Sequence, residues 1–296
     1  MTVRIYETGV DESDPEAILS RALKLKKCGS LRVFLDALSI VAKDALKPHV
    51  VGYLDATMKR KGGKKSKTKK QAKGAFGILV EKIVFGRTPN NKSEADFPSC
   101  ELELKVTGQR EKDDESKERV SLSMIPKELV HGEKPYDMAI DNKLAYNKFG
   151  PIKSACQVLF ITYKYAPQKV YLDARITSAF IWKPSASQRK TMLDDFIIVR
   201  RMCDYGFAHC VGEGLGMFMG AATKSAGDEE GFEKPRAEND IKALMESLKG
   251  ELSNPERFEI FRKKVETKLR KDGIIKRRCY SLKRKSVTEI ISAHVS

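Results

Sequence analysis

The sequence lacks the residue patterns that would hold a structural metal or a disulfide framework. Its six cysteines are dispersed, and no two of them form a Cys-x-x-Cys pair. None of the four histidines stands at metal-ligand spacing from another, and the adjacent His209 and Cys210 offer only two of the four ligands of a structural zinc site. In a chain of 296 residues, dispersed cysteines argue against a disulfide-stabilised fold. We therefore expect these cysteines and histidines to be structural.

Long apolar runs and repeats are also missing. No run of apolar residues approaches the length of a membrane span, and the first residues lack the basic-then-apolar order of a signal peptide. These absences predict a soluble cytoplasmic protein without a membrane partner. No internal repeat is evident, and the length suffices for one large domain or two small ones with a hydrophobic core.

Positive charge is in excess. The chain has 56 Lys and Arg residues against 40 Asp and Glu residues, which gives a net charge of +16. Such a charge favours a polyanionic partner, and nucleic acid is the first candidate, whereas the alternative is a merely soluble basic protein. Residues 59–73 (KRKGGKKSKTKKQAK) concentrate lysine in a segment that cannot bury a core. We expect this basic loop to contact DNA phosphates, with a solvated loop or a nuclear-targeting run as alternatives.

The spacing of apolar residues indicates a mixed order of helices and strands. Helical spacing predicts helices over residues 14–28, 30–42, 74–85, 185–205 and 287–295, and a helical arm in two pieces over residues 229–272. Alternating or continuous apolar runs predict strands over residues 102–106, 120–125, 158–163, 170–182 and 215–219. The first two strands would form a hairpin through the charged turn at residues 109–119. This order predicts an α+β fold with a central mixed sheet flanked by helices.

An acidic segment carries the candidate chemistry. Residues 94–105 read EADFPSCELELK, and strand alternation places Glu103 and Lys105 on one face with Leu104 buried on the other. Asp96 arrives from the preceding turn. Carboxylates that hold Mg²⁺ can activate water and stabilise charge on a phosphodiester, and a neighbouring lysine can assist. Taken alone, the same residues are more typical of a salt-bridged edge strand.

The surrounding sequence resembles the MutH family of DNA endonucleases within the PD-(D/E)xK nuclease superfamily. KGAFGILVEKIVFG followed by EADFPSCELELKVTG is similar to the family's Lys-Gly-x-x-Gly-x-x-x-Glu helix, its Asp-Phe step and its Glu-Leu-Lys strand. The matching positions are Lys73, Gly74, Gly77, Glu81, Gly86, Asp96, Phe97, Glu103, Leu104 and Lys105. Downstream, GEGLGMFMGAATKSAG (212–227) is similar to the segment with a DNA-reading loop in GATC-cutting relatives, and CYSLKRKSVTEIISAHV (279–295) to the closing strand and helix.

The resemblance implies roles for individual residues. Asp96 and Glu103 would be metal ligands, the Leu104 carbonyl a third ligand and Lys105 the catalytic lysine. Glu81 would complete the acidic cluster, because a lone glutamate on an apolar helix face is costly unless it is paired, metal-bound or extended to solvent. The residues expected to contact DNA are Thr223, Lys224, Lys283, Tyr280 and Lys153, although Lys153 stands about one position out of register.

These features predict a restriction-endonuclease-like protein. The expected architecture is a single MutH-like endonuclease domain over residues 1–296, with a core at about 30–227 and 276–296 and a helical insertion at about 228–275. The expected activity is Mg²⁺-dependent cleavage of double-stranded DNA by a type II restriction enzyme at GATC, with sensitivity to adenine methylation. A cognate adenine methyltransferase would then belong to the same system, and a homodimer on DNA is left open.

Two alternatives remain. The first is a strand-nicking mismatch-repair endonuclease of MutH type, and the second is a basic DNA-binding protein with an inert acidic site. The mismatch-repair members carry an Arg-Pro-Lys run where this chain has GAATK (220–224), which favours the restriction branch. The role of the insertion stays open between dimerisation, clamping of DNA and neither.

Overall fold

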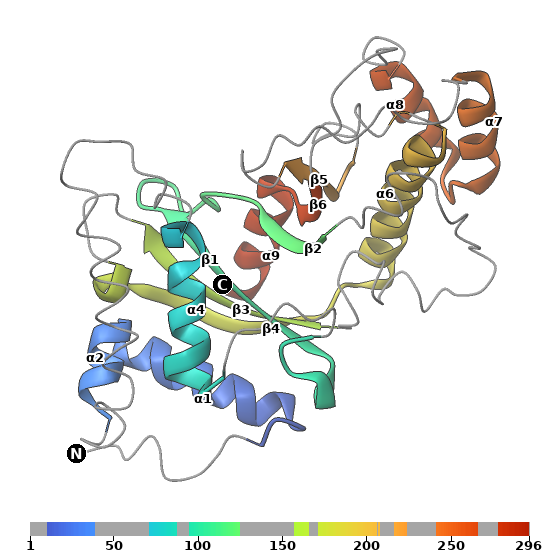
Figure 1. Cartoon of the computed structure of the whole chain (residues 1–296). Helices are drawn as coiled ribbons and strands as arrows, with labels where there is room; N and C mark the ends of the chain where they lie inside the picture. The colour runs from blue at the N-terminus through green and yellow to red at the C-terminus, as the bar shows by residue number, and fades with distance from the viewer. Residues whose placement is uncertain are drawn as a thin grey trace. The chain divides into compact units, whose positions relative to one another are not determined.

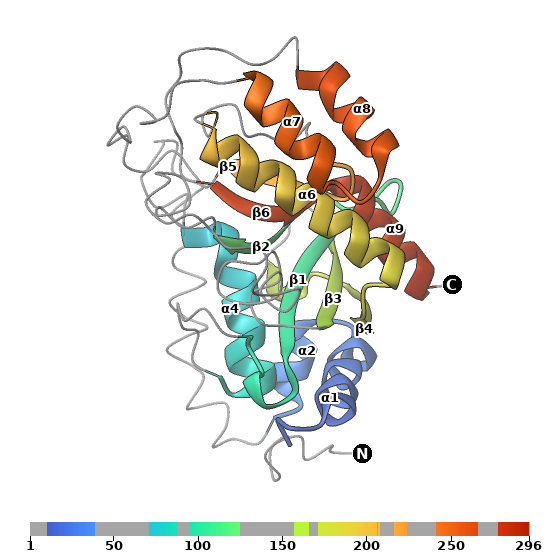
Figure 2. The ribbon, with the colours of Figure 1, turned by 90° about the vertical axis from the view of Figure 1, so that its right-hand side faces the viewer.

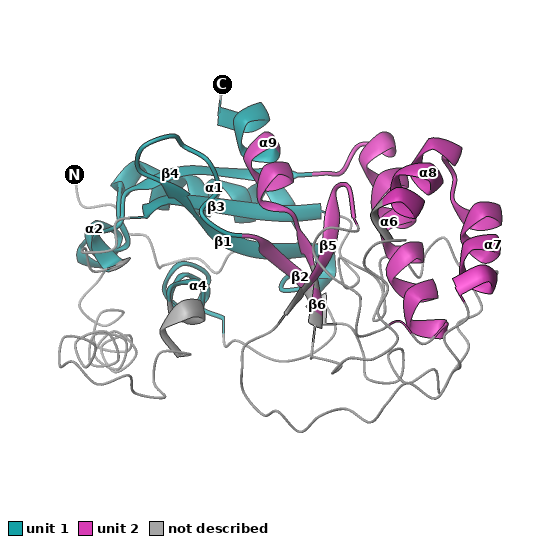
Figure 3. Cartoon of the chain, turned by 90° about the horizontal axis from the view of Figure 1, so that it is seen from above, with its two compact units in different colours: residues 1–118, 157–182, 290–296 teal, residues 119–156, 183–289 magenta. Residues whose placement is uncertain are grey.

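The structure is a computed structural model that describes residues 11–38, 71–87, 95–124, 157–165, 171–205, 207, 216–223, 241–265 and 278–295. Figure 1 shows its helices and strands in chain order. The chain divides into two compact units, which Figure 3 distinguishes by colour. Unit 1 comprises residues 1–118, 157–182 and 290–296, and unit 2 comprises residues 119–156 and 183–289. The prediction of a single endonuclease domain stays a prediction.

The helices of unit 1 begin and end at residues suited to those places. Helix α1 (Pro15–Cys28) starts after Asp14, whose carboxylate accepts the Glu16 N–H at 2.9 Å, and ends at Gly29 in the left-handed conformation. Helix α2 (Leu31–Asp36) starts after Ser30, whose hydroxyl accepts a backbone N–H at 3.3 Å. Helix α4 (Gln71–Phe85) is followed by Gly86, again left-handed with φ +66°.

A three-stranded mixed sheet is the centre of unit 1. Strand β1 (Leu102–Arg110) pairs in parallel with β3 (Gln157–Tyr165), which pairs antiparallel with β4 (Ile176–Trp182). Two short 3₁₀ helices, η2 (Pro98–Cys100) and η5 (Tyr171–Asp173), precede β1 and β4. Helices α1 and α4 contact each other, and they contact β4 and β1, respectively. Apolar side chains of the three helices and the sheet form one buried core, so β1 is held against α4.

Unit 2 is built around an antiparallel sheet and a long helix. The strands are β2 (Val120–Met124), β6 (Arg278–Leu282) and β5 (Met219–Thr223), in the order β2-β6-β5. Helix α6 (Ala186–Asp204) starts with a capping box between Ser185 and Gln188 and contacts β5. Helices α7 (Ile241–Glu251) and α8 (Pro255–Val265) lie beside it, with α7 against α6 and α8 against α7 (Figure 2). Helix α9 (Arg284–Val295) follows β6, and its residues 284–289 belong to unit 2 and its residues 290–295 to unit 1.

The α+β class with a mixed sheet is confirmed, but three details of the prediction are wrong. The strands at 102–110 and 120–124 do not form a hairpin, because β1 pairs with β3 and β2 pairs with β6 in the other sheet. Residues 171–175 are not part of a strand, since a 3₁₀ turn precedes β4. The strand expected at 215–219 begins only at Met219, because the preceding backbone N–H groups are bound by Asp195.

Among the described helices, none is long and apolar enough to cross a membrane.

Candidate active site

A tight turn brings Asp96 next to strand β1. Phe97 and Leu102 exchange two backbone hydrogen bonds, with N–H to O=C distances of 2.9 and 3.1 Å. Between them, residues 98–100 form the 3₁₀ turn, and Glu101 reverses the chain in the left-handed conformation with φ +51°. Since Phe97 is paired with Leu102, the residue before Phe97 lies opposite the residue after Leu102. The turn therefore sets Asp96 beside Glu103.

Hydrogen bonds connect the three candidate catalytic residues. The Asp96 N–H donates to Glu103 Oε2 at 3.3 Å, and the Leu104 N–H donates to Asp96 Oδ2 at 2.9 Å. The Lys105 ammonium group forms an ion pair with Glu103 Oε1. The structure thus brings Asp96, Glu103 and Lys105 close together, as expected from the sequence.

The backbone of Leu104 faces the same turn. Leu102 directs both its N–H and its C=O to Phe97, away from β3, and backbone groups two residues apart along a strand point to the same side. The hydrogen bond from Leu104 N–H to Asp96 follows this rule. The Leu104 carbonyl therefore points to the side of β1 on which Asp96 lies. This side of the strand offers two carboxylates and one carbonyl, which are hard oxygen donors of the kind that Mg²⁺ prefers.

Burial makes the charges of this site dependent on one another. The Glu103 side chain is 1% exposed and the Lys105 side chain 19% exposed. A carboxylate so deeply buried is stable only when it is paired or hydrogen-bonded, and Glu103 has both the Lys105 ammonium and the Asp96 N–H. Leu104 is buried in the core of unit 1, as predicted.

Aromatic packing fixes the turn to helix α4. Phe97 is fully buried, and its ring contacts the ring of Phe85 edge-on at a centroid distance of 5.3 Å. The guanidinium group of Arg87 lies 5.0 Å from the centre of the Phe97 ring, a distance typical of a cation–π contact. The position of Asp96 therefore depends on the ring of its neighbour.

A further residue that the family resemblance places in the acidic cluster is Glu81. It is half-buried on α4, the helix that contacts β1. Within the described part of the chain, however, no three His, Cys, Asp or Glu side chains are grouped closely enough to hold a metal ion. The structure does not gather Glu81 with Asp96 and Glu103.

The cysteine in the turn is not activated. Burial raises the pKa of the Cys100 thiol above its usual value, so the thiol stays protonated near neutral pH. Its Sγ lies 3.7 Å from the Phe97 carbonyl oxygen. This agrees with a structural role for Cys100.

The residues expected to contact DNA lie in or beside the sheet of unit 2 where they are described. Thr223 ends β5 and pairs with Arg278, and Tyr280 lies on β6 opposite Ala221. Lys283 follows β6, and its ammonium group donates to the Gly216 carbonyl at 2.8 Å. Lys153, Lys224 and the basic loop up to residue 70 lie outside the described residues.

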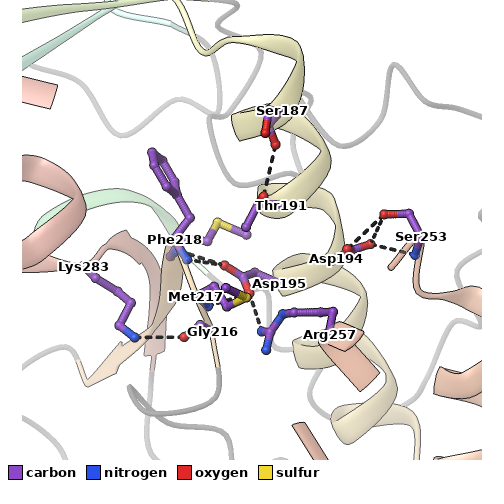
Figure 4. A network of polar contacts seen from close by, with 11 residues as sticks. Ser187, Thr191, Asp194, Asp195, Gly216, Met217, Phe218, Ser253, Arg257 and Lys283 are labelled. Carbon is purple, nitrogen blue, oxygen red and sulfur yellow. Dashed lines mark hydrogen bonds and ion pairs between the residues drawn. The ribbon is translucent and has the colours of Figure 1, made fainter. Parts of the chain in front are cut away.

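Unit 2 contains a cluster of buried charges that the sequence did not predict. Asp195 on α6 binds the segment before β5 and an arginine of α8 (Figure 4). The signal was present in the sequence, since Asp194 and Asp195 interrupt an otherwise apolar stretch of a predicted helix. Buried carboxylates in such a stretch require partners, but the sequence does not identify them.

Two carboxylates and a lysine are thus gathered at strand β1, with Asp96 contributed by the preceding turn and Glu103 and Lys105 by the strand itself. Residues 85–195 match the family model described as DNA mismatch repair enzyme MutH. The match supports the MutH and type II restriction endonuclease-like family, as the sequence predicted, and the α+β fold is compatible with the fold of that family. The matched residues include Asp96, Glu103 and Lys105. No curated protein matches the chain.

Proposed function

We propose that the protein is a Mg²⁺-dependent endonuclease that cuts double-stranded DNA at a specific sequence, GATC in the first instance. The observation that carries this proposal is the grouping of Asp96, Glu103 and Lys105 within the segment that matches the MutH model. The positive net charge of +16 supports a polyanionic substrate.

The donor set fits a magnesium ion. Asp96, Glu103 and the Leu104 carbonyl would hold it, since all three offer oxygen on the same side of β1. When bound, Mg²⁺ lowers the pKa of a coordinated water and stabilises negative charge on the phosphate. Glu81 would support this acidic cluster from helix α4.

The protein residues prepare the site for a charged substrate. The Leu104 N–H holds the Asp96 carboxylate in place, and the Lys105 ammonium holds that of Glu103. When a scissile phosphate enters, the Lys105 ammonium is within reach of the same edge and would neutralise charge that develops on phosphorus. Lys105 is also suited to orient the attacking water, because ammonium groups donate up to three hydrogen bonds.

Sequence-specific binding is assigned to unit 2. We assign DNA contacts to Thr223, Lys224, Lys283, Tyr280 and Lys153. In the described state the Lys283 ammonium donates one hydrogen bond to a backbone carbonyl, and because an ammonium has three N–H donors this bond does not preclude a contact with DNA. A cognate adenine methyltransferase and a homodimer on DNA complete the proposal.

One observation favours the nicking alternative. The matching family model is described as a mismatch-repair enzyme, which is the type of protein that the nicking alternative names. The sequence GAATK at 220–224 favours restriction instead.

A supercoiled plasmid with Mg²⁺ tests the proposal. Linear product from the protein alone supports restriction, and a persistent nicked circle supports the nicking alternative. Binding without cleavage by the wild type would support a DNA-binding protein with an inert site. Asp96→Ala and Lys105→Ala should abolish cleavage, whereas Glu111→Ala and Lys112→Ala, exposed on the turn after β1, should not. Cleavage that persists in Asp96→Ala and Lys105→Ala would refute the catalytic assignment.

A further inference from the structure

Asp195 binds the backbone of the residues that lead into strand β5. Its carboxylate is 1% exposed and accepts three successive N–H groups, from Met217 at 2.8 Å, Phe218 at 2.8 Å and Met219 at 2.9 Å (Figure 4). Hydrogen bonds from backbone N–H groups to a buried carboxylate are short and strong. The segment before β5 is thereby fixed to helix α6.

The same segment is held from its other side by the end of β6. The Lys283 ammonium donates to the Gly216 carbonyl at 2.8 Å, and the Lys283 N–H donates to the Phe218 carbonyl at 3.1 Å. The turn is so tight that a Cβ at Gly216 would lie 1.5 Å from the Met219 carbonyl oxygen. Residues 216–219 are therefore hydrogen-bonded both to α6 and to the end of β6, and these bonds set where β5 begins.

An arginine from the inserted helices completes the Asp195 site. Arg257 on α8 is 2% exposed, and its Nη2 lies 2.5 Å from Asp195 Oδ1. Loss of the arginine would leave the buried carboxylate without its counter-charge.

Two further contacts attach the inserted helices to α6. Ser253, between α7 and α8, donates from its N–H at 3.0 Å and its hydroxyl at 2.9 Å to Asp194. Arg201 forms an ion pair with Glu251 at the end of α7. The hairpin of α7 and α8 is therefore attached at both of its helices, and Arg257 has a fixed approach to Asp195.

The hydrogen bonds of Asp195 and Lys283 to residues 216–219 control the register of β5. Met219 pairs with Leu282 and Thr223 with Arg278, so the start of the strand determines the place of its last residue. A slip of one residue would turn every side chain of the strand to the opposite face.

We propose that Asp195 is a positioning residue for sequence-specific DNA binding, and that the α7–α8 hairpin serves to complete its site through Arg257. This inference rests on the proposed function, in which Thr223 at the end of β5 contacts DNA. It gives the insertion a role inside unit 2 that requires neither dimerisation nor a DNA clamp.

The test compares two affinities of each variant. Fluorescence anisotropy without Mg²⁺ gives the Kd for a GATC duplex and for a scrambled duplex of equal length. In Arg257→Leu, the ratio of these Kd values should fall at least tenfold relative to the wild type, while the Kd for the scrambled duplex stays within twofold. Arg257→Lys should restore most of the ratio. Arg262→Leu is the matched control, because Arg262 forms an exposed ion pair with Glu259 on the same helix.

The outcomes distinguish a failure of the proposed function from a failure of the positioning role of Asp195. A wild-type ratio near one would refute sequence-specific binding and with it the proposed function. A selective wild type with an equally selective, folded Arg257→Leu would overturn the positioning role alone. If circular dichroism shows Arg257→Leu to be unfolded, the milder Asp195→Asn replaces it, with faster amide exchange at residues 217–219 as an added expected result. If that variant is unfolded too, the pair is needed for folding and the proposal is overturned.

Discussion

Phe97 gives the strongest test of how the fold positions the active site. The ring is fully buried, packs against Phe85 and carries the Arg87 guanidinium over its face. Truncation of a buried phenylalanine to alanine costs about 3–5 kcal/mol. Because 1 kcal/mol corresponds to about 2–4 °C for a protein of 150–250 residues, Phe97→Ala should lower the Tm by about 10 °C.

Phe97→Ala should also lower the cleavage rate by more than the loss of folded protein explains. Asp96 precedes Phe97, and the turn that sets it beside Glu103 is anchored by the ring. A displacement of about 1 Å in a catalytic group can cost roughly 100-fold in rate. We therefore expect the cleavage rate of Phe97→Ala to fall about 100-fold at a temperature at which the variant is still folded. Phe97→Leu, which keeps most of the volume, should lose less than about 1.5 kcal/mol.

Phe34→Ala is the matched control, because Phe34 is an equally buried phenylalanine of the same core on helix α2. It should lose a similar amount of stability and keep its cleavage rate at permissive temperature. Thermal unfolding by circular dichroism and a plasmid assay on the same samples measure both quantities. Equal loss of activity in the two variants, or full activity in Phe97→Ala, would refute the reasoning.

Two further predictions concern the free energy of unfolding. Gly216→Ala should lower it by about 1–3 kcal/mol through overpacking, because the added Cβ would overlap a backbone oxygen. Gly250→Ala on α7 should raise it by about 0.5–1 kcal/mol, because the added Cβ meets no atom within 4 Å, and urea unfolding measures both variants. The hydrogen bond from Arg32 lowers the pKa of Asp173, so this pair stabilises the protein above the unfolded-state pKa of about 3.9 and loses its effect as pH falls through the folded value. Since both side chains are more than 40% exposed, Asp173→Asn should cost at most about 1 kcal/mol at pH 7, with no difference in strong acid; an equal loss at both pH values would contradict this.

The active-site segment was predictable because its geometry is local. Asp96, Glu103 and Lys105 lie within ten positions of one another, and strand alternation with one turn suffices to bring them together. The starts of two helices were equally predictable, since Ser30 and Ser185 are capping residues at the predicted starts. Short-range patterns of this kind depend on few unknown partners.

The parts that could not be predicted depend on long-range pairing. The alternation of apolar residues identified β1 as a strand, but its residues do not indicate that it pairs with β3 and not with β2. The carboxylate of Asp195 replaces strand pairing for the residues before β5, and its arginine partner stands 62 positions away. The role of Glu81 stays a prediction of the motif match, since its place in the acidic cluster depends on how helix α4 packs against β1.

Digestion of DNA with Mg²⁺, followed by sequencing of the cut ends, tests the central claim most directly. Plasmid that lacks adenine methylation at GATC and plasmid that carries it are compared, with Lys105→Ala as the inactive control. We expect the wild type to cut the unmethylated plasmid, with ends that map to GATC, and to leave the methylated plasmid intact. Ends scattered over unrelated sequences, or cleavage that is unchanged in Lys105→Ala, would contradict the assignment of a site-specific nuclease centred on Asp96, Glu103 and Lys105.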